Sequence, residues 1–281
     1  MAQAQISPDG HQPTFSFGVI CAFFWASCTW ACAYAAPTAI PIAEASSGLA
    51  FSESEVGAHA AHIKSRFLLE ADAKNERGCA LHCEAIAEVW NTLLPVIRSQ
   101  QPRNPIALRL EIVNSSSVDA LAFAEGTVIL SEAFVSRLAL SKAHIAFVLA
   151  HEASHVLLQH ERQTLTSALA WMAPMRASSA AEIYQEMEDR YFQMDTYLSV
   201  VAHQTEFEAD EIGLGLAAMA GYDPHLQLEF MQTLAQRGSR QSMLSTHPEA
   251  SLRLGRLREH LPLAVRLFER AQGWDQPAPV H

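Results

Sequence analysis

Two histidines and a glutamate within five residues form the strongest chemical signal in this sequence. The pentapeptide HEASH, residues 151–155, lies in a stretch from 141 to 160 that has neither Gly nor Pro and is predicted to be helical. His151 and His155 are one helical turn apart, so both imidazoles can bind one metal ion. Glu152 is offset by about 100° and would stand beside the metal as a general base for bound water. The pattern predicts a hydrolytic metal centre.

A segment rich in carboxylates, EFEAD at residues 206–210, is the candidate source of a third ligand. Glu206 and Asp210 are one turn apart on one helical face. Glu206 would complete a His₂Glu site with a fourth position left for water, and Asp210 could accept the free ring N–H of a ligand histidine. The alternative is that these acids form a solvated helix face, which is what we expect of Glu208 and Glu211.

Four motifs occur in a fixed order along the chain. They are HEASH with the preceding AFVLA, EFEAD-x-x-G at Glu206–Gly213, AGYDP at Ala220–Pro224, and STHP at Ser245–Pro248 followed by Arg253. With these motifs, about residues 52–262 resemble the gluzincin metallopeptidases that include the CAAX prenyl endopeptidase and bacterial HtpX-like and periplasmic proteases. The resemblance implies a zincin-like domain that binds one zinc ion.

The resemblance also implies roles for particular residues. Zinc would be bound by His151, His155 and Glu206, with Glu152 as the catalytic base. His247 lies in the STHP motif, whose histidine stabilises the oxyanion in some relatives and occupies the fourth metal position of latent enzymes in others. Arg253 would support the site, as would Asp210 by orienting a ligand.

The function implied is a zinc-dependent endopeptidase that hydrolyses protein or peptide substrates, by resemblance misfolded proteins of the cell envelope. The alternative from another class is a latent or inactive relative that acts as a chaperone-like binding protein. Thirty acidic and nineteen basic residues give a net charge of −11. This balance argues against a nucleic-acid binder, which needs a basic surface to displace counterions from phosphates.

The N-terminal part of the chain has the character of a targeting segment. Residues 15–36 carry no charge and end in an A-x-A type cleavage site, so they are interpreted as a secretory signal, with a membrane anchor or a buried helix as alternatives. The first basic residue is Lys64, so the usual positive n-region is missing. We therefore expect a periplasmic or envelope protein, with association to the membrane through residues 15–36 as the alternative.

The rest of the chain is predicted to be mostly α with a small antiparallel β-sheet (α+β). The predicted organisation is a signal or anchor at 1–36, a linker at 37–51, the zinc peptidase domain at 52–272 and a tail at 273–281. Strands are expected at 106–113, 120–124 and 127–130. Helices are expected from Ser52, which begins a capping box, and at 80–97, 131–140, 141–160, 178–221 with breaks, 224–235 and 248–261.

Two further features are left with alternatives. Cys79 and Cys83 could pair in an oxidising compartment, form a metal knuckle with His82, or remain two thiols on a helix. His160 is expected at the C-terminal end of the helix that carries HEASH, without a ligand role, because two histidines and one glutamate already suffice for zinc.

Overall fold

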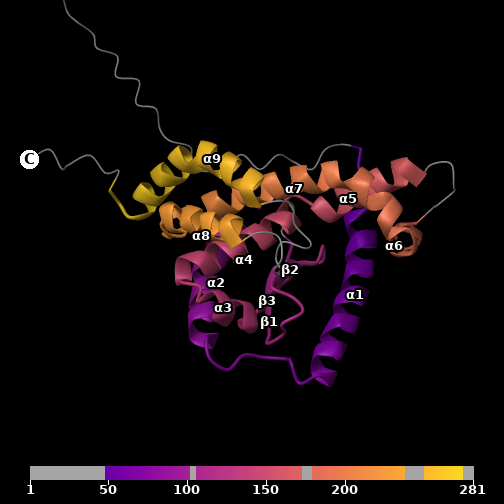
Figure 1. Cartoon of the computed structure of the whole chain (residues 1–281), viewed down its shortest axis with the longest axis horizontal. Coiled ribbons are helices and arrows are strands. Elements are labelled where there is room, and N and C mark those ends of the chain that lie inside the picture. Colours follow the sequence, from indigo (N-terminus) through magenta and orange to yellow (C-terminus); the bar gives the residue numbers. More distant parts are fainter. Residues whose placement is uncertain (1–47, 102–105, 173–178, 238–249, 275–281) are drawn as a thin grey trace, which may run out of the picture. The chain divides into compact units, whose positions relative to one another are not determined.

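The computed structural model describes residues 48–101, 106–172, 179–237 and 250–274, with the side chains of 191–197 left aside. This part of the chain is mostly helical (Figure 1). The helices are α1 (Glu53–Ala73), α2 (Cys83–Ser99), α3 (Glu132–Leu138), α4 (Lys142–Leu157), α5 (His160–Met172), α6 (Ala180–Asp189), α7 (Tyr191–Met219), α8 (Pro224–Arg237) and α9 (Ala250–Ala271).

A small sheet accompanies the helices in the order β1-β3-β2, built from β1 (Arg109–Val113), β2 (Ala120–Ala122) and β3 (Thr127–Ser131). The predicted fold class, mostly α with a small sheet, is confirmed, but the sheet is mixed. β2 and β3 form the expected antiparallel hairpin, whereas β1 and β3 are parallel. The chain passes from β1 to the edge as β2 and returns through the centre as β3, so β3 runs in the same direction as β1.

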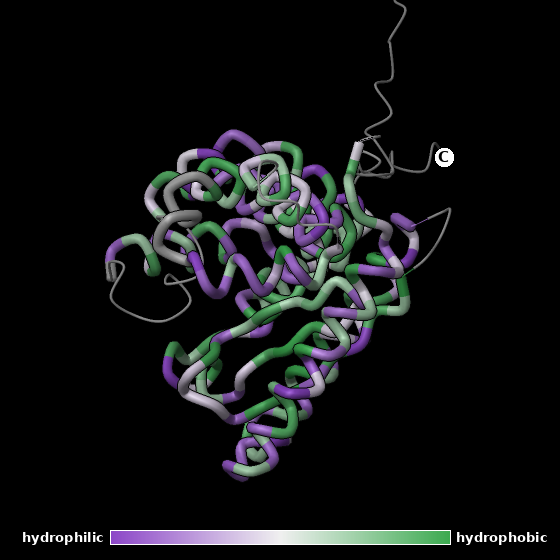
Figure 2. The backbone as a smooth tube through the Cα atoms, turned by 90° about the vertical axis from the view of Figure 1, so that its right-hand side faces the viewer, coloured by the Kyte–Doolittle hydropathy of each residue, from purple (hydrophilic) through white to green (hydrophobic). Residues whose placement is uncertain are grey.

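The helix α4 lies between the sheet and the C-terminal helices (Figure 1). It packs against α7, α2 and α8, and also against β2 and β3. Most of its side chains are buried, including those of His151 and Glu152. The helices α2, α6 and α9 are amphipathic, and hydrophobic and hydrophilic residues alternate along the helical coils (Figure 2). Because α4 lies in the core, its polar side chains need hydrogen-bond or ion-pair partners there to offset the cost of burying them.

The ends of several helices differ from the sequence prediction. Ser52 caps α1 by accepting from the Glu55 amide, as predicted, but the Glu55 side chain accepts from the Ala180 amide of α6 instead of closing the capping box. α2 continues through Pro95 to Ser99. The prediction that α4 extends to His160 is wrong. α4 ends at Leu157 and His160 begins α5, because Gln159 adopts a left-handed conformation (φ 55°) that interrupts the helix.

Cys79 and Cys83 form a disulfide, with their Cα atoms 5.5 Å apart. This distance is typical of disulfides, and it is reached because α2 begins only at Cys83, so that Cys79 belongs to a turn rather than to the helix. Glu132 of α3 is buried beside this turn and accepts hydrogen bonds from the amides of Ala80 and His82. Of the alternatives for the two cysteines, the structure has the disulfide.

Residues 1–47 lie outside the described residues, and so do the predicted signal or anchor and nearly all of the predicted linker. Most of the predicted tail also lies outside them, so the domain boundaries stay predictions. Within the ranges described, no helix has both the length and the apolar character needed to cross a bilayer.

Candidate metal centre

Two helices that cross in the core bring the predicted ligands together. α4 supplies His151 and His155, and α7 supplies Glu206 from a position 51 residues beyond His155 in the chain. The close approach of these helices depends on Gly213 of α7, because a Cβ atom at this position would lie 2.8 Å from the amide nitrogen of His151. Only glycine allows the two backbones to be this near each other.

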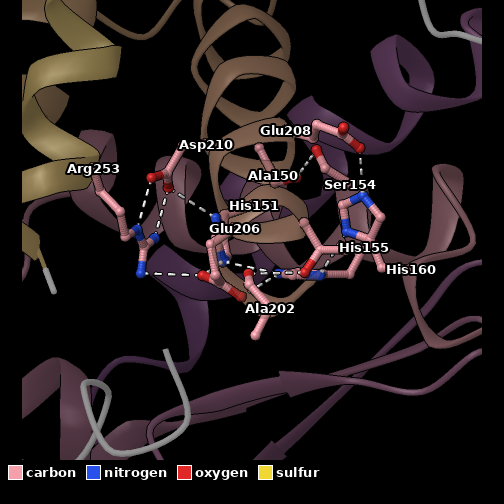
Figure 3. Close-up of polar contacts among 11 residues, drawn as sticks. Ala150, His151, Ser154, His155, His160, Ala202, Glu206, Glu208, Asp210 and Arg253 are labelled. Carbon is pink, nitrogen blue, oxygen red and sulfur yellow. Dashed lines mark hydrogen bonds and ion pairs between the residues drawn. The ribbon is translucent and has the colours of Figure 1, made fainter. Parts of the chain in front are cut away.

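The three candidate ligands point at one another in the close-up view (Figure 3). His151 Nε2 and His155 Nε2 are 3.1 Å apart. Glu206 Oε2 lies 3.4 Å from His151 Nε2, and Glu206 Oε1 lies 3.3 Å from His155 Nε2. In a tetrahedral zinc site with ligand distances of about 2.0–2.2 Å, neighbouring ligand atoms are about 3.3–3.6 Å apart. Glu206 offers a different oxygen to each histidine, and one ligand atom from each of the three residues lies within 4.8 Å of the others, so the donor types and their proximity fit zinc.

A buried network of charged side chains contacts His151 at Nδ1, the ring nitrogen opposite the candidate ligand atom. This nitrogen lies 3.0 Å from Asp210 Oδ1. Arg253 of α9, which is 1% exposed, donates to both oxygens of Asp210 at 2.7 and 2.6 Å, and its Nη1 lies 3.1 Å from Glu206 Oε2. Although burial disfavours its charged form, Asp210 has a pKa below the usual range because Arg253 and His151 stabilise the carboxylate. Asp210 and Arg253, both predicted to support the site, thus belong to one ion-pair network with His151 and Glu206.

Without a bound metal, the two histidines differ in their protonation. Burial opposes the charged form of His151, but hydrogen bonds to Asp210 and Glu206 outweigh it and raise the pKa of His151 to about 9. Burial lowers the pKa of His155 to about 3, and Glu206 offsets this only in part. His155 is therefore already the neutral imidazole that a metal needs, whereas His151 must lose a proton.

His155 has its own partner on the side away from Glu206. His160 Nδ1 lies 2.9 Å from His155 Nδ1, and His160 Nε2 lies 3.3 Å from Glu208 Oε2 (Figure 3). The expectation of a solvated face is met in part by Glu208, because its side chain is 36% exposed while one carboxylate oxygen meets His160 where α5 packs against α7. Glu211 is similarly exposed, at 42% of its side chain, and meets His260 of α9 at 3.1 Å.

Glu152 is 2% exposed and borders a cavity of about 420 Å³, together with His155. The edge strand β2 and the turn that follows it form one wall of this cavity, and the start of α5 forms another. The carboxylate thus stands where the candidate ligands meet the space open to a substrate. With both histidines neutral, as metal binding requires, and with Glu152, Glu206 and Asp210 ionised, Arg253 balances one of the three negative charges, so the net charge of these buried groups is −2, which matches a divalent cation.

One predicted site residue cannot be placed, because His247 lies outside the described residues. Sequence reasoning overlooked two features: the packing role of Gly213, and the contact of His160 with His155. The glycine was visible as the last residue of EFEAD-x-x-G, but its neighbour on α4 is fixed only by the crossing of the helices.

Comparison with known proteins agrees with this geometry. A model of peptidase family M48 matches residues 84–261. The chain is 28% identical over 181 residues to the beta-barrel assembly-enhancing protease of Escherichia coli (strain K12), covering 56% of this chain and 36% of that protein. It is 27% identical over 168 residues to the mitochondrial metalloendopeptidase OMA1 of Arabidopsis thaliana, covering 59% and 33%. The chain thus spans about a third of the length of these relatives.

Proposed function

The chain belongs to peptidase family M48, and from this premise we propose that it is a zinc-dependent metalloendopeptidase whose ligands are His151, His155 and Glu206. The observation that carries the proposal is the set of three donor groups whose atoms lie 3.1–3.4 Å apart beside a buried Glu152 at a cavity. One zinc ion is the cofactor that these donors suit, because two imidazoles and a carboxylate leave a position open for chemistry.

When bound, zinc lowers the pKa of water and polarises a carbonyl group. Glu152 takes the proton from the attacking water and returns it to the leaving amine. It lines the cavity next to His155, one of the candidate ligands. Asp210 and Arg253 hold His151 and Glu206 in place, so that neither ligand has to reorganise during the reaction.

The shape of the cavity supports a protein substrate bound in an extended form. β2 is an edge strand, and residues 117–124 along it line the cavity. An unpaired strand edge can add an extended peptide through main-chain hydrogen bonds. The apolar side chains of Ile63, Val118 and Leu121, which also line the cavity, favour substrates with hydrophobic residues near the cleaved bond.

The place of action is proposed from the relatives and the N-terminal sequence. One matched protein is named for β-barrel assembly and the other for mitochondria, and both names agree with work at a membrane or envelope. Misfolded envelope proteins are therefore the proposed substrates, and residues 15–36 are the proposed signal or anchor. The inactive, chaperone-like alternative is not favoured, because Glu152 is intact and borders the cavity.

The test compares the purified chain with its Glu152→Gln variant, measuring bound zinc and cleavage of casein. We expect both proteins to hold one zinc ion and the variant to lose cleavage by about 10²–10⁴-fold, the usual contribution of a general base. Full activity in the variant would contradict the assignment of Glu152 as the general base. Glu206→Ala should lose zinc, and Glu211→Ala on the exposed face of α7 is its matched control and should retain it.

His247 needs its own experiment, because the family resemblance gives it two opposite roles. A catalytic His247 predicts that His247→Ala lowers cleavage with zinc retained. An inhibitory fourth ligand predicts that the same change raises cleavage. We propose the catalytic role, so a rise in activity would contradict it.

A further inference from the structure

A chain of side-chain contacts leads from His155 away from the candidate metal centre. His155 Nδ1 meets His160 Nδ1 at 2.9 Å, and His160 Nε2 meets Glu208 Oε2 at 3.3 Å. The second oxygen of Glu208 accepts from Gln204 Nε2 at 2.6 Å. The His160 side chain is only 4% exposed. The contacts thus join the start of α5 to the middle of α7.

The direction of these hydrogen bonds follows from the chemistry of imidazole. If His155 binds the metal through Nε2, the atom nearest to His151 and Glu206, then its proton is on Nδ1. That N–H can donate only to an unprotonated Nδ1 of His160. The neutral ring of His160 then carries its proton on Nε2, which donates to the carboxylate of Glu208. Each partner in the chain fixes the tautomer of the next.

We propose that His160 and Glu208 are positioning residues that hold His155 in the tautomer and ring orientation that binds the metal. The inference rests on the proposed function, since it takes His155 as a ligand. Groups that hydrogen-bond the second nitrogen of a ligand histidine fix its orientation and raise its basicity. His151 has such a partner in Asp210, and His160 with Glu208 supplies the equivalent for His155.

The break between α4 and α5 is what makes this contact. In an uninterrupted helix, a residue five positions after His155 would be turned about 140° around the axis and would point away from it. Gln159 instead takes a left-handed conformation at φ 55°, which costs free energy for a residue other than glycine. The turn brings His160 back to face His155, with their ring centroids 4.9 Å apart.

The first test measures zinc affinity of the full chain by competition with a chelator. We expect His160→Ala to weaken zinc binding by about 10–100-fold. His160→Asn should stay within a few-fold of the unmodified protein, because the Asn oxygen lies where His160 Nδ1 accepts. Glu208→Ala should weaken binding by a smaller factor, and Glu211→Ala, three residues further along α7, should not change it. Equal affinities for His160→Ala and the unmodified protein would overturn the proposal.

The second test needs no variant, so it holds even if His160→Ala fails to fold. In the zinc-loaded chain labelled with ¹⁵N-histidine, we expect His155 to be protonated on Nδ1 and His160 on Nε2 alone. A His160 protonated on Nδ1 would overturn the inference. The proposed function fails separately, if the unmodified chain binds no zinc or if Glu206→Ala binds as well as the unmodified chain does.

Discussion

The two histidines of the candidate metal centre are held in opposite ways. His151 is fully buried and is backed by charges, with Asp210 paired to Arg253 across α7 and α9. His155 is partly exposed, borders the cavity, and contacts the His160 ring, which in turn contacts Glu208 near the surface. One side of the site is a buried ion-pair network and the other is a hydrogen-bond chain beside the cleft.

This difference separates stability from ligand orientation. Buried charges are costly to leave unpaired, so removing one partner on the His151 side should lower the stability of the domain most. The His155 side has few buried charges and lies next to the cavity, so changes there should alter the metal site while leaving the fold intact. Substitutions on the two sides should therefore have different measurable effects.

The largest expected effect comes from Arg253. Replacing it by Met leaves the buried carboxylates of Asp210 and Glu206 with only His151 as a positive partner, and we expect the free energy of unfolding to fall by about 3–5 kcal/mol. Urea denaturation of the metal-free protein measures the change. Arg258→Met, on an exposed position of the same helix, is the control and should have little effect. If both variants lowered the free energy of unfolding by the same amount, the buried ion-pair network would not be what stabilises this side of the site.

The crossing of α4 and α7 provides the next test. Gly213→Ala places a methyl group 2.8 Å from the His151 backbone, and we expect it to lower the free energy of unfolding by about 1–3 kcal/mol and to weaken zinc binding. Gly255→Ala in α9 is the matched control, since a Cβ there meets nothing within 4 Å. It should be neutral or stabilise by up to about 1 kcal/mol. If both variants behave alike, the close approach is not what requires glycine.

The smallest expected effect is the pH dependence of zinc affinity, which should reflect the different pKa values of the two histidines. Zinc needs both rings neutral, and only His151, with its pKa raised to about 9, holds a proton at pH 7 in the metal-free protein. Zinc affinity should therefore rise about tenfold per pH unit between about pH 7 and 8, with release of about one proton. Calorimetry in buffers of different ionisation enthalpy counts that proton. Release of two protons, or of none, would contradict the contrast between His151 and His155.

The sequence predicted the parts of the site that depend on local periodicity. His151, Glu152 and His155 follow from the helical repeat of α4, and the shared face of Glu206 and Asp210 follows from that of α7. The meeting of the two helices was implied by the family resemblance, because spacing within one helix cannot position another. The role of His160 was hidden, because it depends on a backbone conformation at Gln159 that breaks the expected helix.

The sheet and the cysteines show the same limit of local reasoning. All three strands were predicted close to their observed ranges, but the parallel pairing of β1 with β3 depends on the path of the whole chain. The spacing of Cys79 and Cys83 left a disulfide open, and the start of α2 at Cys83 decides it. Local patterns thus indicated the elements, and tertiary contacts determine their pairing.

The central claim is that His151, His155 and Glu206 bind one zinc ion, and anomalous diffraction at the zinc edge from crystals of the purified protein tests it most directly. We predict a single strong peak at about 2.0–2.2 Å from Nε2 of each histidine and from a carboxylate oxygen of Glu206. A peak elsewhere, or none at this position in zinc-loaded crystals, would contradict the account.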